Sequence, residues 1–467
     1  MARRERSRRR PSRDYAQPKS EGPIEPPAAA RSSRRHHLPQ YNHNGHEVTK
    51  HIEPEGESGR KGIHPFKFLK ICFRSASTPS MLVNFLWPMV PVAIALHFAM
   101  PKQHLAIFVT SYIAMVPAAN LVGFAGQEFA RKLPKVLGVV MEVTFGSIVE
   151  IVLFMVLLKT GREQNVPVIR AAILGSILAN MLLCLGFCFI AGGLKRHGKE
   201  RHDQEFHPAI SEAGSGLMLV AGMGLVLPTV YHSALSGRTD LTLGVGEIAY
   251  ETLKISRAVA IILLFAYFVY LMYQMKTHDG LFEDIYTADE HKDADRHKDL
   301  LKAKLTMTEC LIALAISLAC VSMIAVFLVK QIHYIVHERH ISDAFLGLIL
   351  VPLVEKAAEH LTAIDEAYDG QMNFALAHVL GASIQTAFLN TPLVVIVGWC
   401  MNIGMDLKFE VFDAVALILA ILVLGSFLRD GKSNYLEGVL CVLVYLIIAI
   451  CAYFYPNPPV ATAAAEH

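Results

Sequence analysis

The residues with the clearest chemical potential are four ionisable side chains that follow an apolar run. Residues 344–354 are apolar enough to lie in a bilayer, and Glu355, Lys356, Glu359 and His360 come within the next two helical turns. At 3.6 residues per turn, Glu355 lies over Glu359, and Lys356 lies over His360. A charge at bilayer depth costs about 2.5–3.5 kcal/mol or more, so these residues indicate a function. An ion-pair ladder at a helix end is the purely structural alternative.

A second carboxylate stands in a similar setting earlier in the chain. Glu150 is the one charged residue in the apolar run 143–152. In both halves, the acidic helix is followed by a helix that begins with small and amide residues, at 174–180 and at 380–386. Two such carboxylates predict a duplicated membrane protein that handles a cation. An intramembrane metal-dependent hydrolase is another class to weigh, but the chain has no His-Glu-x-x-His motif.

The composition excludes an ordinary soluble protein. Of the 467 residues, 53% are hydrophobic and 18% are charged, and the apolar residues form long runs. These runs, of about twenty residues, match the length of helix that crosses about 30 Å of hydrocarbon. The 43 basic and 41 acidic residues nearly balance, so we expect no nucleic-acid partner. No cysteines have CxxC spacing, so they predict neither a disulfide framework nor a zinc site, and we expect no cofactor.

We predict an all-α polytopic membrane protein with about eleven transmembrane helices, one extra N-terminal helix plus two inverted five-helix repeats. The predicted spans are 81–99, 104–124, 137–158, 167–192, 209–231, 252–275, 305–330, 342–365, 372–400, 409–428 and 434–455. The predicted parts are a disordered basic cytosolic tail (1–78), the first helix and first repeat (79–275), an acidic cytosolic loop (276–304), the second repeat (305–455) and a C-terminal tail (456–467). With the basic tail in the cytosol, Lys and Arg concentrate in the cytosolic loops, as the positive-inside rule requires. The acidic loop is interpreted as a solvated linker, with a cation-attracting segment as the alternative.

Inverted repeats bring the middle of both halves to one site near the bilayer midplane. Glu150 and Glu359 then face each other as the cation-binding and proton-coupling pair. Two ionised carboxylates neutralise a divalent cation, and other oxygens complete a calcium shell of about six to eight ligands. Without the cation, the paired negative charges favour protonation, so cation and protons compete for one site. The expected supporting residues are Gly146, Ser147, Ser176, Asn180, His360, Ser383 and Gln385. The expected points of helix interruption or close approach are Gly146, Gly175 and Gly381.

At these residues the chain resembles a known family. The fungal and plant vacuolar calcium/proton exchangers, within the calcium/cation antiporter superfamily, contain segments similar to Met115–Ala125, Phe145–Ile151, Leu174–Leu183, Glu355–His360 and Gly381–Gln385. The resemblance covers about residues 79–455. It implies a secondary transporter, not an enzyme, that moves calcium or a similar divalent cation from the cytosol into an acidic organelle in exchange for protons. The implied location is the vacuolar membrane, with the lipid bilayer as surroundings and no oligomeric state implied.

The chain departs from the Gly-Asn-x-x-Glu motif that this family carries in each half. Ser147 stands at the asparagine of the first motif, and Glu355 and Lys356 replace the glycine and asparagine of the second. Lysine offers no oxygen, and its ammonium repels a divalent cation at close range. If Lys356 acts as a tethered cation, the same fold serves as a monovalent-cation carrier or a transport-inactive regulatory relative. We favour a flank pair between Lys356 and Glu355, which leaves the Glu150–Glu359 site intact.

Overall fold

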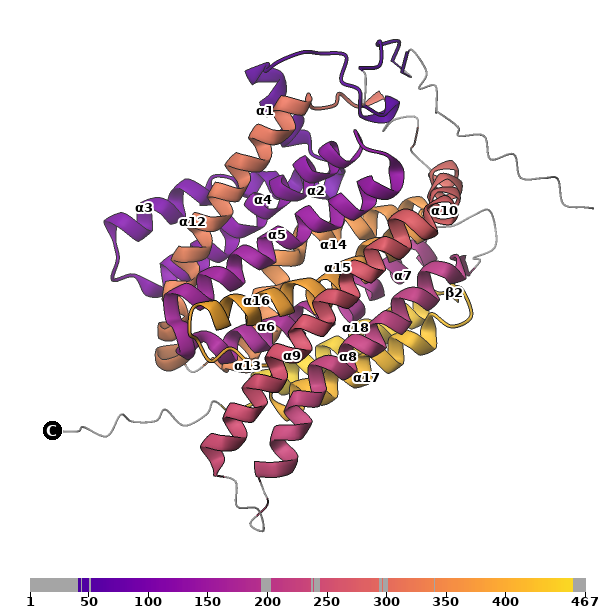
Figure 1. The fold of residues 1–467 in the computed structure, drawn as a ribbon. Helices are drawn as coiled ribbons and strands as arrows, with labels where there is room; N and C mark the ends of the chain where they lie inside the picture. Colours follow the sequence, from indigo (N-terminus) through magenta and orange to yellow (C-terminus); the bar gives the residue numbers. More distant parts are fainter. Residues whose placement is uncertain are drawn as a thin grey trace, which may run out of the picture. The chain divides into compact units, whose positions relative to one another are not determined.

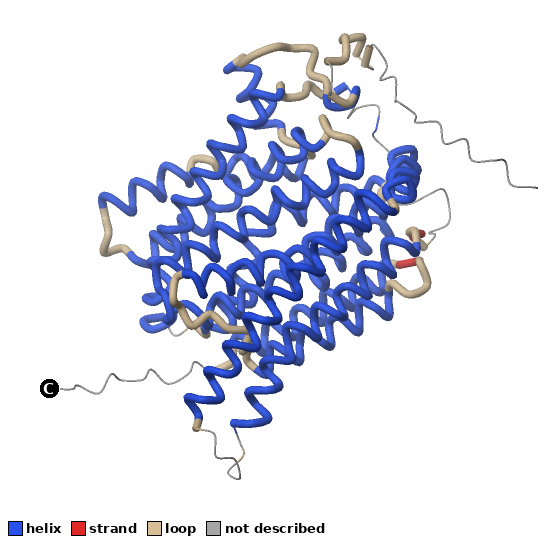
Figure 2. Tube along the Cα trace, viewed as in Figure 1, coloured by secondary structure: helices blue, strands red, loops and turns tan. Residues whose placement is uncertain are grey.

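Long apolar runs in this chain fold as helices because a helix satisfies every backbone hydrogen bond within its own segment, as a bilayer requires. The computed structural model describes residues 41–42, 44–49, 52–194, 203–236, 238, 244–293, 296, 301–339 and 341–456, all of them within the unit Pro39–His467. Helices dominate these residues, and the strands are confined to a two-stranded antiparallel pair that joins Gln204–Glu205 (β1) to Lys432–Ser433 (β2) (Figure 2).

The α-helices follow one another along the chain in the order of their labels in Figure 1, and the shorter η segments precede them or lie between them. In the first half they are η1 (Pro54–Gly56), α1 (Pro65–Arg74), α2 (Thr78–Val83), η2 (Asn84–Leu86), α3 (Met89–Ala99), α4 (His104–Ala130), α5 (Lys135–Gly161), η3 (Arg162–Asn165), α6 (Val166–Leu178), η4 (Ala179–Cys184), α7 (Leu185–Leu194), α8 (Pro208–Ser236), α9 (Val245–Met272) and η5 (Tyr273–Thr277). In the second half they are α10 (Asp279–Lys292), α12 (Met307–Arg339), α13 (Asp343–Phe345), η6 (Leu346–Leu350), α14 (Val351–Asp369), α15 (Met372–Gln385), η7 (Thr386–Asn390), α16 (Thr391–Cys400), α17 (Val411–Phe427) and α18 (Tyr435–Tyr453).

Nine helical stretches among the described residues are long and apolar enough to cross a membrane. They are Thr78–Ala99, His104–Ala130, Lys135–Gly161, Glu163–Leu194, Pro208–Ser236, Gly246–Thr277, Met307–Val336, Met372–Cys400 and Tyr435–Tyr453. The predicted spans 342–365 and 409–428 are also helical, but α14 carries several charges and α17 has only 17 residues. The predicted polytopic all-α class is therefore confirmed, whereas the count of eleven is not.

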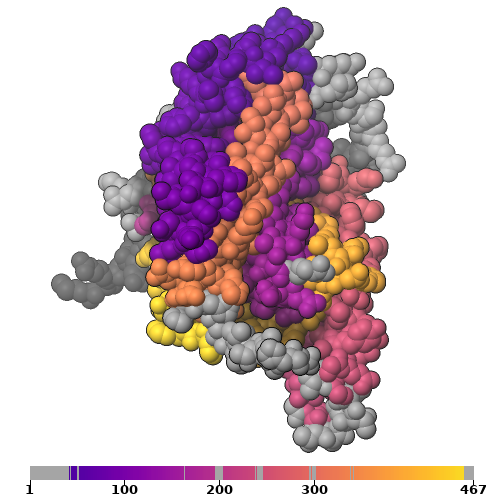
Figure 3. Space-filling model, turned by 90° about the vertical axis from the view of Figure 1, so that its left-hand side faces the viewer, coloured from indigo at the N-terminus to yellow at the C-terminus, as the bar shows by residue number. Residues whose placement is uncertain are grey.

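The two halves of the chain interlock. α12 of the second half packs along α4 of the first half, and Figure 3 shows this orange helix running beside the indigo and purple N-terminal helices. In the interior, α15 packs on α5, while α14 contacts α4, α6 and α7. Elements from both halves therefore surround α14, the helix that carries the four ionisable residues singled out in the sequence.

Helix interruption at glycine was the wrong expectation. α5, α6 and α15 run without a break through Gly146, Gly175 and Gly381. π-helical turns occur instead at η4, η5, η6 and η7, and turns of this kind are often found at functional sites. η6 and η7 each precede a proline, Pro352 or Pro392, and the wider turn accommodates a residue that has no backbone N–H.

Close approach was the right expectation for two of the three glycines. A Cβ on Gly175 would collide with the backbone carbonyl of Leu348 on η6. One on Gly146 would lie 2.7 Å from Glu359 Oε1. At Gly381, by contrast, the nearest atoms belong to Val143 at 3.4 Å, which is an ordinary contact.

Two segments predicted to lack structure contain packed helices. In the predicted tail 1–78, the described residues include α1, and Arg60 forms an ion pair with the buried Glu309 at 3.0 Å. Disorder was thus the wrong expectation there, and the part of the prediction that concerns residues 1–40 lies outside the described residues. In the loop 276–304, α10 buries Tyr286, and Asp289 accepts hydrogen bonds from the backbone N–H groups that begin α15. A solvated linker was wrong because this amphipathic helix has its own apolar face and caps α15.

Candidate cation site

Glu150 is held in the interior by residues from the other half of the chain. It lies on α5 and is fully buried. Its Oε2 atom accepts hydrogen bonds from Thr386 Oγ1 at 2.8 Å and from Asn390 Nδ2 at 3.1 Å, both on η7. Lys356 Nζ lies 3.0 Å from the same oxygen. Three donors around one oxygen suit an ionised carboxylate, because a buried charge is tolerated when it is paired and hydrogen-bonded.

Lys356 bridges the two glutamates that the sequence predicted to form the site. Its side chain is fully buried, and its ammonium nitrogen lies 3.0 Å from Glu150 Oε2 and 3.3 Å from both carboxylate oxygens of Glu359. Glu150 and Glu359 therefore converge as predicted, but on a positively charged side chain of the protein itself.

The favoured pair between Lys356 and Glu355 was wrong. Glu355 is buried, and neither of its carboxylate oxygens has a hydrogen-bond partner among the described residues. Consecutive residues on a helix do not face each other, whereas residues three apart do, so α14 aims Lys356 at Glu359. This periodicity was already available in the sequence and favours the tethered-cation alternative. A carboxyl group buried without a partner is more stable in its neutral form than as an ion.

Glu359 is the member of the pair that meets a cavity. About one fifth of its side chain is exposed, at 19%, whereas that of Glu150 is not exposed at all. The missing side chain of Gly146 makes room for the Glu359 carboxylate, since a Cβ there would lie within 2.7 Å of Oε1. α5 therefore contributes one glutamate to the site and the glycine that seats the other.

The six predicted supporting residues other than Gly146 divide into two hydrogen-bonded pairs and two separate serines. Ser147 Oγ donates to Gln385 Oε1 at 2.7 Å, which links α5 to α15. His360 Nε2 and Asn180 Oδ1 lie 3.0 Å apart, which links α14 to η4. These two pairs join opposite halves of the chain.

Both serines are buried away from such cross-links. Ser383 donates to the carbonyl of Val379 on its own helix, and Ser176 Oγ has no hydrogen-bond partner among the described residues. A cation-binding role for any of these six residues remains a prediction.

Thr386 and Asn390 were missed in the sequence, although both donate to Glu150. A signal for the first was present. Thr386 follows Gly381 by five positions, as Asn180 follows Gly175, so the repeat places the two at equivalent positions. Asn390 gives no such signal, because its contact depends on the π-helical turn η7.

Two neighbouring hollows share part of their walls, and one of them borders Glu359. The inner cavity has a volume of about 30 Å³, enough for one or two water molecules, and its walls include Gly146, Glu359 and His360. The outer vestibule, of about 190 Å³, lies among the loops around Arg131 and Asp369. Its remaining charged walls are Glu55, Glu142, Glu290, Asp293, Arg296, Lys304, Asp365 and Glu366. Both hollows share the walls Ala76, Gln127, Glu142 and Thr362.

The vestibule lies on the side that the loop charges predict to be cytosolic, and its electrostatics are mixed. Glu290 on α10 forms an ion pair with Lys135 at 2.8 Å. Burial nevertheless raises the pKa of Glu290 above its usual value, and nearby Glu55 adds to this effect. Carboxylates here lie close enough to raise each other's affinity for protons.

Comparison with known proteins gives this arrangement a family. The sodium/calcium exchanger protein family matches residues 103–276 and 310–454, which include both halves of the site. The chain belongs to this family. It is 33% identical over 376 residues to vacuolar cation/proton exchanger 5 of Arabidopsis thaliana, covering 80% of this chain and 82% of that protein. It is 30% identical over 352 residues to the vacuolar calcium ion transporter of Schizosaccharomyces pombe, covering 75% of this chain and 80% of the other.

Solved structures give the same fold for this family member. YfkE superposes with a TM-score of 0.63 at 24% identity, covering 80% of this chain and all of that one. A structure described as the H⁺/Ca²⁺ exchanger CAX gives a TM-score of 0.53 at 14% identity and covers 80% and 92% of the two chains. The expected resemblance to the vacuolar exchangers is therefore confirmed. The chain is a multi-pass vacuolar membrane protein and a secondary transporter rather than an enzyme.

Proposed function

We propose that this exchanger moves a cation from the cytosol into the vacuole in return for protons, at the Glu150–Lys356–Glu359 site. Calcium is the first candidate cargo, because the fission yeast relative is named as a calcium transporter. The observation that carries the proposal is the convergence of one glutamate from each half of the chain on one cationic centre. An ammonium group held between two carboxylates occupies the place that a transported cation needs.

Charge balance determines what the site can accept. Two ionised glutamates and one ammonium leave a net charge of −1, which is one short of the charge that neutralises a divalent ion. Calcium therefore requires that Lys356 leave the space between the glutamates or lose its proton. Its four-carbon stem is flexible, so movement of the ammonium is the simpler route. In this mechanism Lys356 neutralises the site between cargo ions, and the incoming cation displaces it.

Protons reach the site through Glu359. This glutamate faces the inner cavity, whereas Glu150 is fully buried and receives three donors. Water in the cavity supplies a proton path to Glu359 but not directly to Glu150. Protonation of Glu359 weakens its hold on a cation and on Lys356 together, because both depend on the carboxylate charge. Exchange then follows from competition at Glu359, with Glu150 as the fixed anion.

Transport of a monovalent cation is the second candidate, and the position of Lys356 favours it. With the ammonium kept in place, the net charge of −1 matches one sodium or potassium ion. The two candidates thus differ in whether Lys356 moves during the cycle.

Ion flux in proteoliposomes tests both candidates. Purified full-length protein is reconstituted with an acidic interior, and uptake of calcium, sodium and potassium is measured with and without the pH gradient. Gradient-dependent calcium uptake supports the first candidate, and sodium or potassium uptake without calcium uptake supports the second. Absence of all three fluxes, in vesicles where a fungal relative is active, would overturn both.

A further inference from the structure

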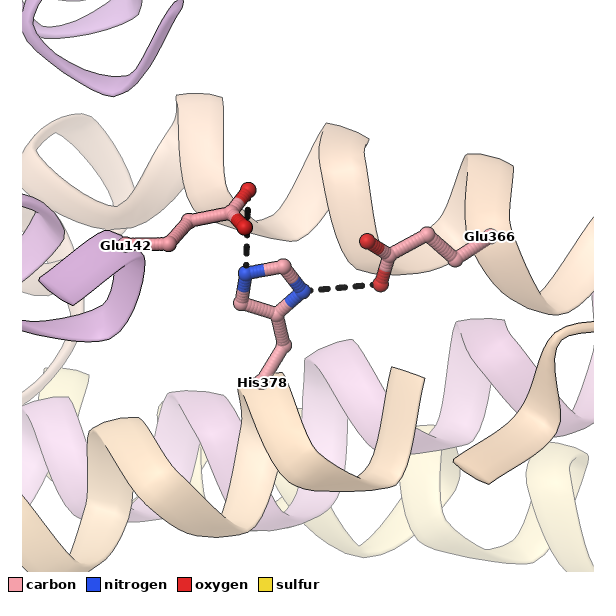
Figure 4. A group of neighbouring side chains, drawn as sticks. All are labelled: Glu142, Glu366 and His378. Atoms are coloured by element: carbon pink, nitrogen blue, oxygen red, sulfur yellow. Dashed lines mark hydrogen bonds and ion pairs between the residues drawn. The ribbon is translucent and has the colours of Figure 1, made fainter. Parts of the chain in front are cut away.

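Three titratable side chains meet where the vestibule and the inner cavity adjoin, a place called the neck below. Glu142 lines both hollows, His378 lines the inner cavity and Glu366 lines the vestibule. Glu142 from α5, Glu366 from α14 and His378 from α15 place one donor atom each within 4.8 Å of one another (Figure 4). The transport site uses none of the three. We propose that Glu142, His378 and Glu366 form a binding site for a divalent transition-metal ion such as Zn²⁺, separate from the Lys356 site.

The two sides of the imidazole ring differ. His378 Nδ1 lies 2.8 Å from Glu366 Oε2, which is a normal hydrogen-bond distance, whereas Nε2 lies 3.4 Å from Glu142 Oε1. The longer distance exceeds that of a good N–H···O bond. It matches the separation of about 3.4 Å between two ligands that lie 2.0–2.1 Å from a tetrahedral metal ion. The gap between Nε2 and Glu142 is thus the right width for an ion.

Glu366 has a different role from Glu142. With Nδ1–H donated to Glu366, Nε2 is the nitrogen left for a metal, which binds there by displacing the proton that the neighbouring Glu142 carboxylate otherwise attracts. A carboxylate behind a metal-binding histidine acts in this way in many metalloproteins and strengthens the binding. The site therefore takes its direct ligands from His378 and Glu142 and uses Glu366 as a positioning residue. Water completes the shell from the cavity side.

Chemistry and access both favour a transition metal over calcium. Calcium prefers an all-oxygen shell, whereas imidazole nitrogen suits zinc and similar ions. Two carboxylates and a neutral imidazole carry a charge of −2, which balances the ion. The three side chains are 13–17% exposed, and Glu142 borders both hollows, so an ion from the vestibule can reach them.

A metal ion held there would stand in the route to Glu359. This consequence rests on the proposed function, since it assumes that cargo passes through the neck. Because α5 belongs to the first half and α14 and α15 to the second, the ion would also tie the two halves together. We therefore expect Zn²⁺ to inhibit exchange, while its binding does not depend on transport.

Metal binding to the purified, tag-free full chain tests the proposal directly. Co²⁺ serves as the spectroscopic probe, because a nitrogen–oxygen site of low coordination number gives a strong visible absorption, and Zn²⁺ is titrated to displace it. The chain has 21 histidines, so the readout is the difference between parent and variant. We expect one displaceable Co²⁺ to be lost in Glu142→Gln and in His378→Asn. Glu366→Gln should bind it about 10–100-fold more weakly.

Glu359→Gln is the matched control. It removes a carboxylate from the wall of the same inner cavity but leaves the three proposed residues intact, so it should retain the Co²⁺ signal. Thermal unfolding and gel filtration establish that each variant is folded. Equal binding by the parent and His378→Asn would overturn the proposal, and so would a signal lost in Glu359→Gln but kept in His378→Asn. In those cases the cluster is an ion pair only, or the metal sits at the transport site.

Discussion

The two motif glutamates occupy equivalent positions in the two halves but sit in different surroundings. Glu150 is sealed in the interior and receives donors from Thr386, Asn390 and Lys356. Of these three donors, Glu359 contacts only Lys356, and it also borders the inner cavity. The repeat therefore supplies two carboxylates, while the residues around them assign different work to each. Under the proposed function, Glu150 is the fixed anion and Glu359 is the exchangeable group.

Neutralising each glutamate in turn should separate these roles and has the largest expected effect. Both Glu150→Gln and Glu359→Gln should reduce exchange to background in proteoliposomes, because either change removes one charge from the site. Stability should differ. Glu150→Gln leaves the buried Lys356 with one partner and removes a buried charge pair, which costs about 3–5 kcal/mol. Glu359→Gln, on the cavity wall, should cost less than half of that.

Thermal unfolding in detergent measures this difference. Equal loss of stability in the two variants would contradict the assignment of a fixed and an exchangeable carboxylate. Normal flux in Glu150→Gln would contradict the two-glutamate site altogether.

Removing the bridging lysine should sharpen the comparison by leaving both carboxylates without their counter-ion. In Lys356→Asn the site carries a charge of −2, so we expect calcium affinity to rise about tenfold or more. The variant should be less stable than the parent without calcium and should regain stability as calcium is added, by linkage to binding.

Lys132→Asn is the matched control for that experiment. Lys132 is also buried, but its ammonium donates to the carbonyl oxygens of Gly56 and Leu305 rather than to carboxylates. Its replacement should lower stability with no recovery in calcium. If Lys356→Asn behaves like this control, Lys356 has a structural role alone.

A smaller contrast is expected between the equivalent glycines of α6 and α15. Gly175→Ala drives a Cβ into the backbone carbonyl of Leu348, which cannot move aside easily, so we expect a loss of about 1–3 kcal/mol. Gly381→Ala meets Val143 at an ordinary distance and should be neutral or stabilising by up to about 1 kcal/mol, since alanine is the better helix former. Expression level and unfolding temperature of the two variants test this. Similar values for both would mean that α6 and η6 separate readily.

Sequence periodicity was sufficient for the fold class and for the pair of glutamates, because apolar run length and repeated motifs are local properties. The same periodicity was sufficient to predict contact between Lys356 and Glu359, although the opposite charges of the adjacent Glu355 and Lys356 suggested that these two would pair. The donors to Glu150 depend on how η7 packs against α5, and the Glu142–His378–Glu366 cluster depends on three helices far apart in sequence. Neither follows from spacing along the chain. The helix α10 was not predicted because its many acidic residues are typical of a solvated linker. Its few apolar residues nevertheless lie on one face of the helix and pack against the protein.

The smallest expected effect belongs to Glu355. It stands four positions before Glu359, as Gly146 stands four positions before Glu150. It is buried, yet it contributes no hydrogen bond through its carboxylate to any described residue. If it is neutral in the folded protein, Glu355→Gln replaces one uncharged group with another of nearly the same shape. Exchange should then stay within about twofold of the parent, and stability should change by less than about 1 kcal/mol. Glu355→Ala, which empties the same space without testing charge, should cost more because it leaves a cavity. Flux and unfolding temperature measured side by side give the answer. Loss of exchange in both variants, with folding retained, would mean that the Glu355 carboxylate itself is needed, and that the second motif works with three charged residues rather than two.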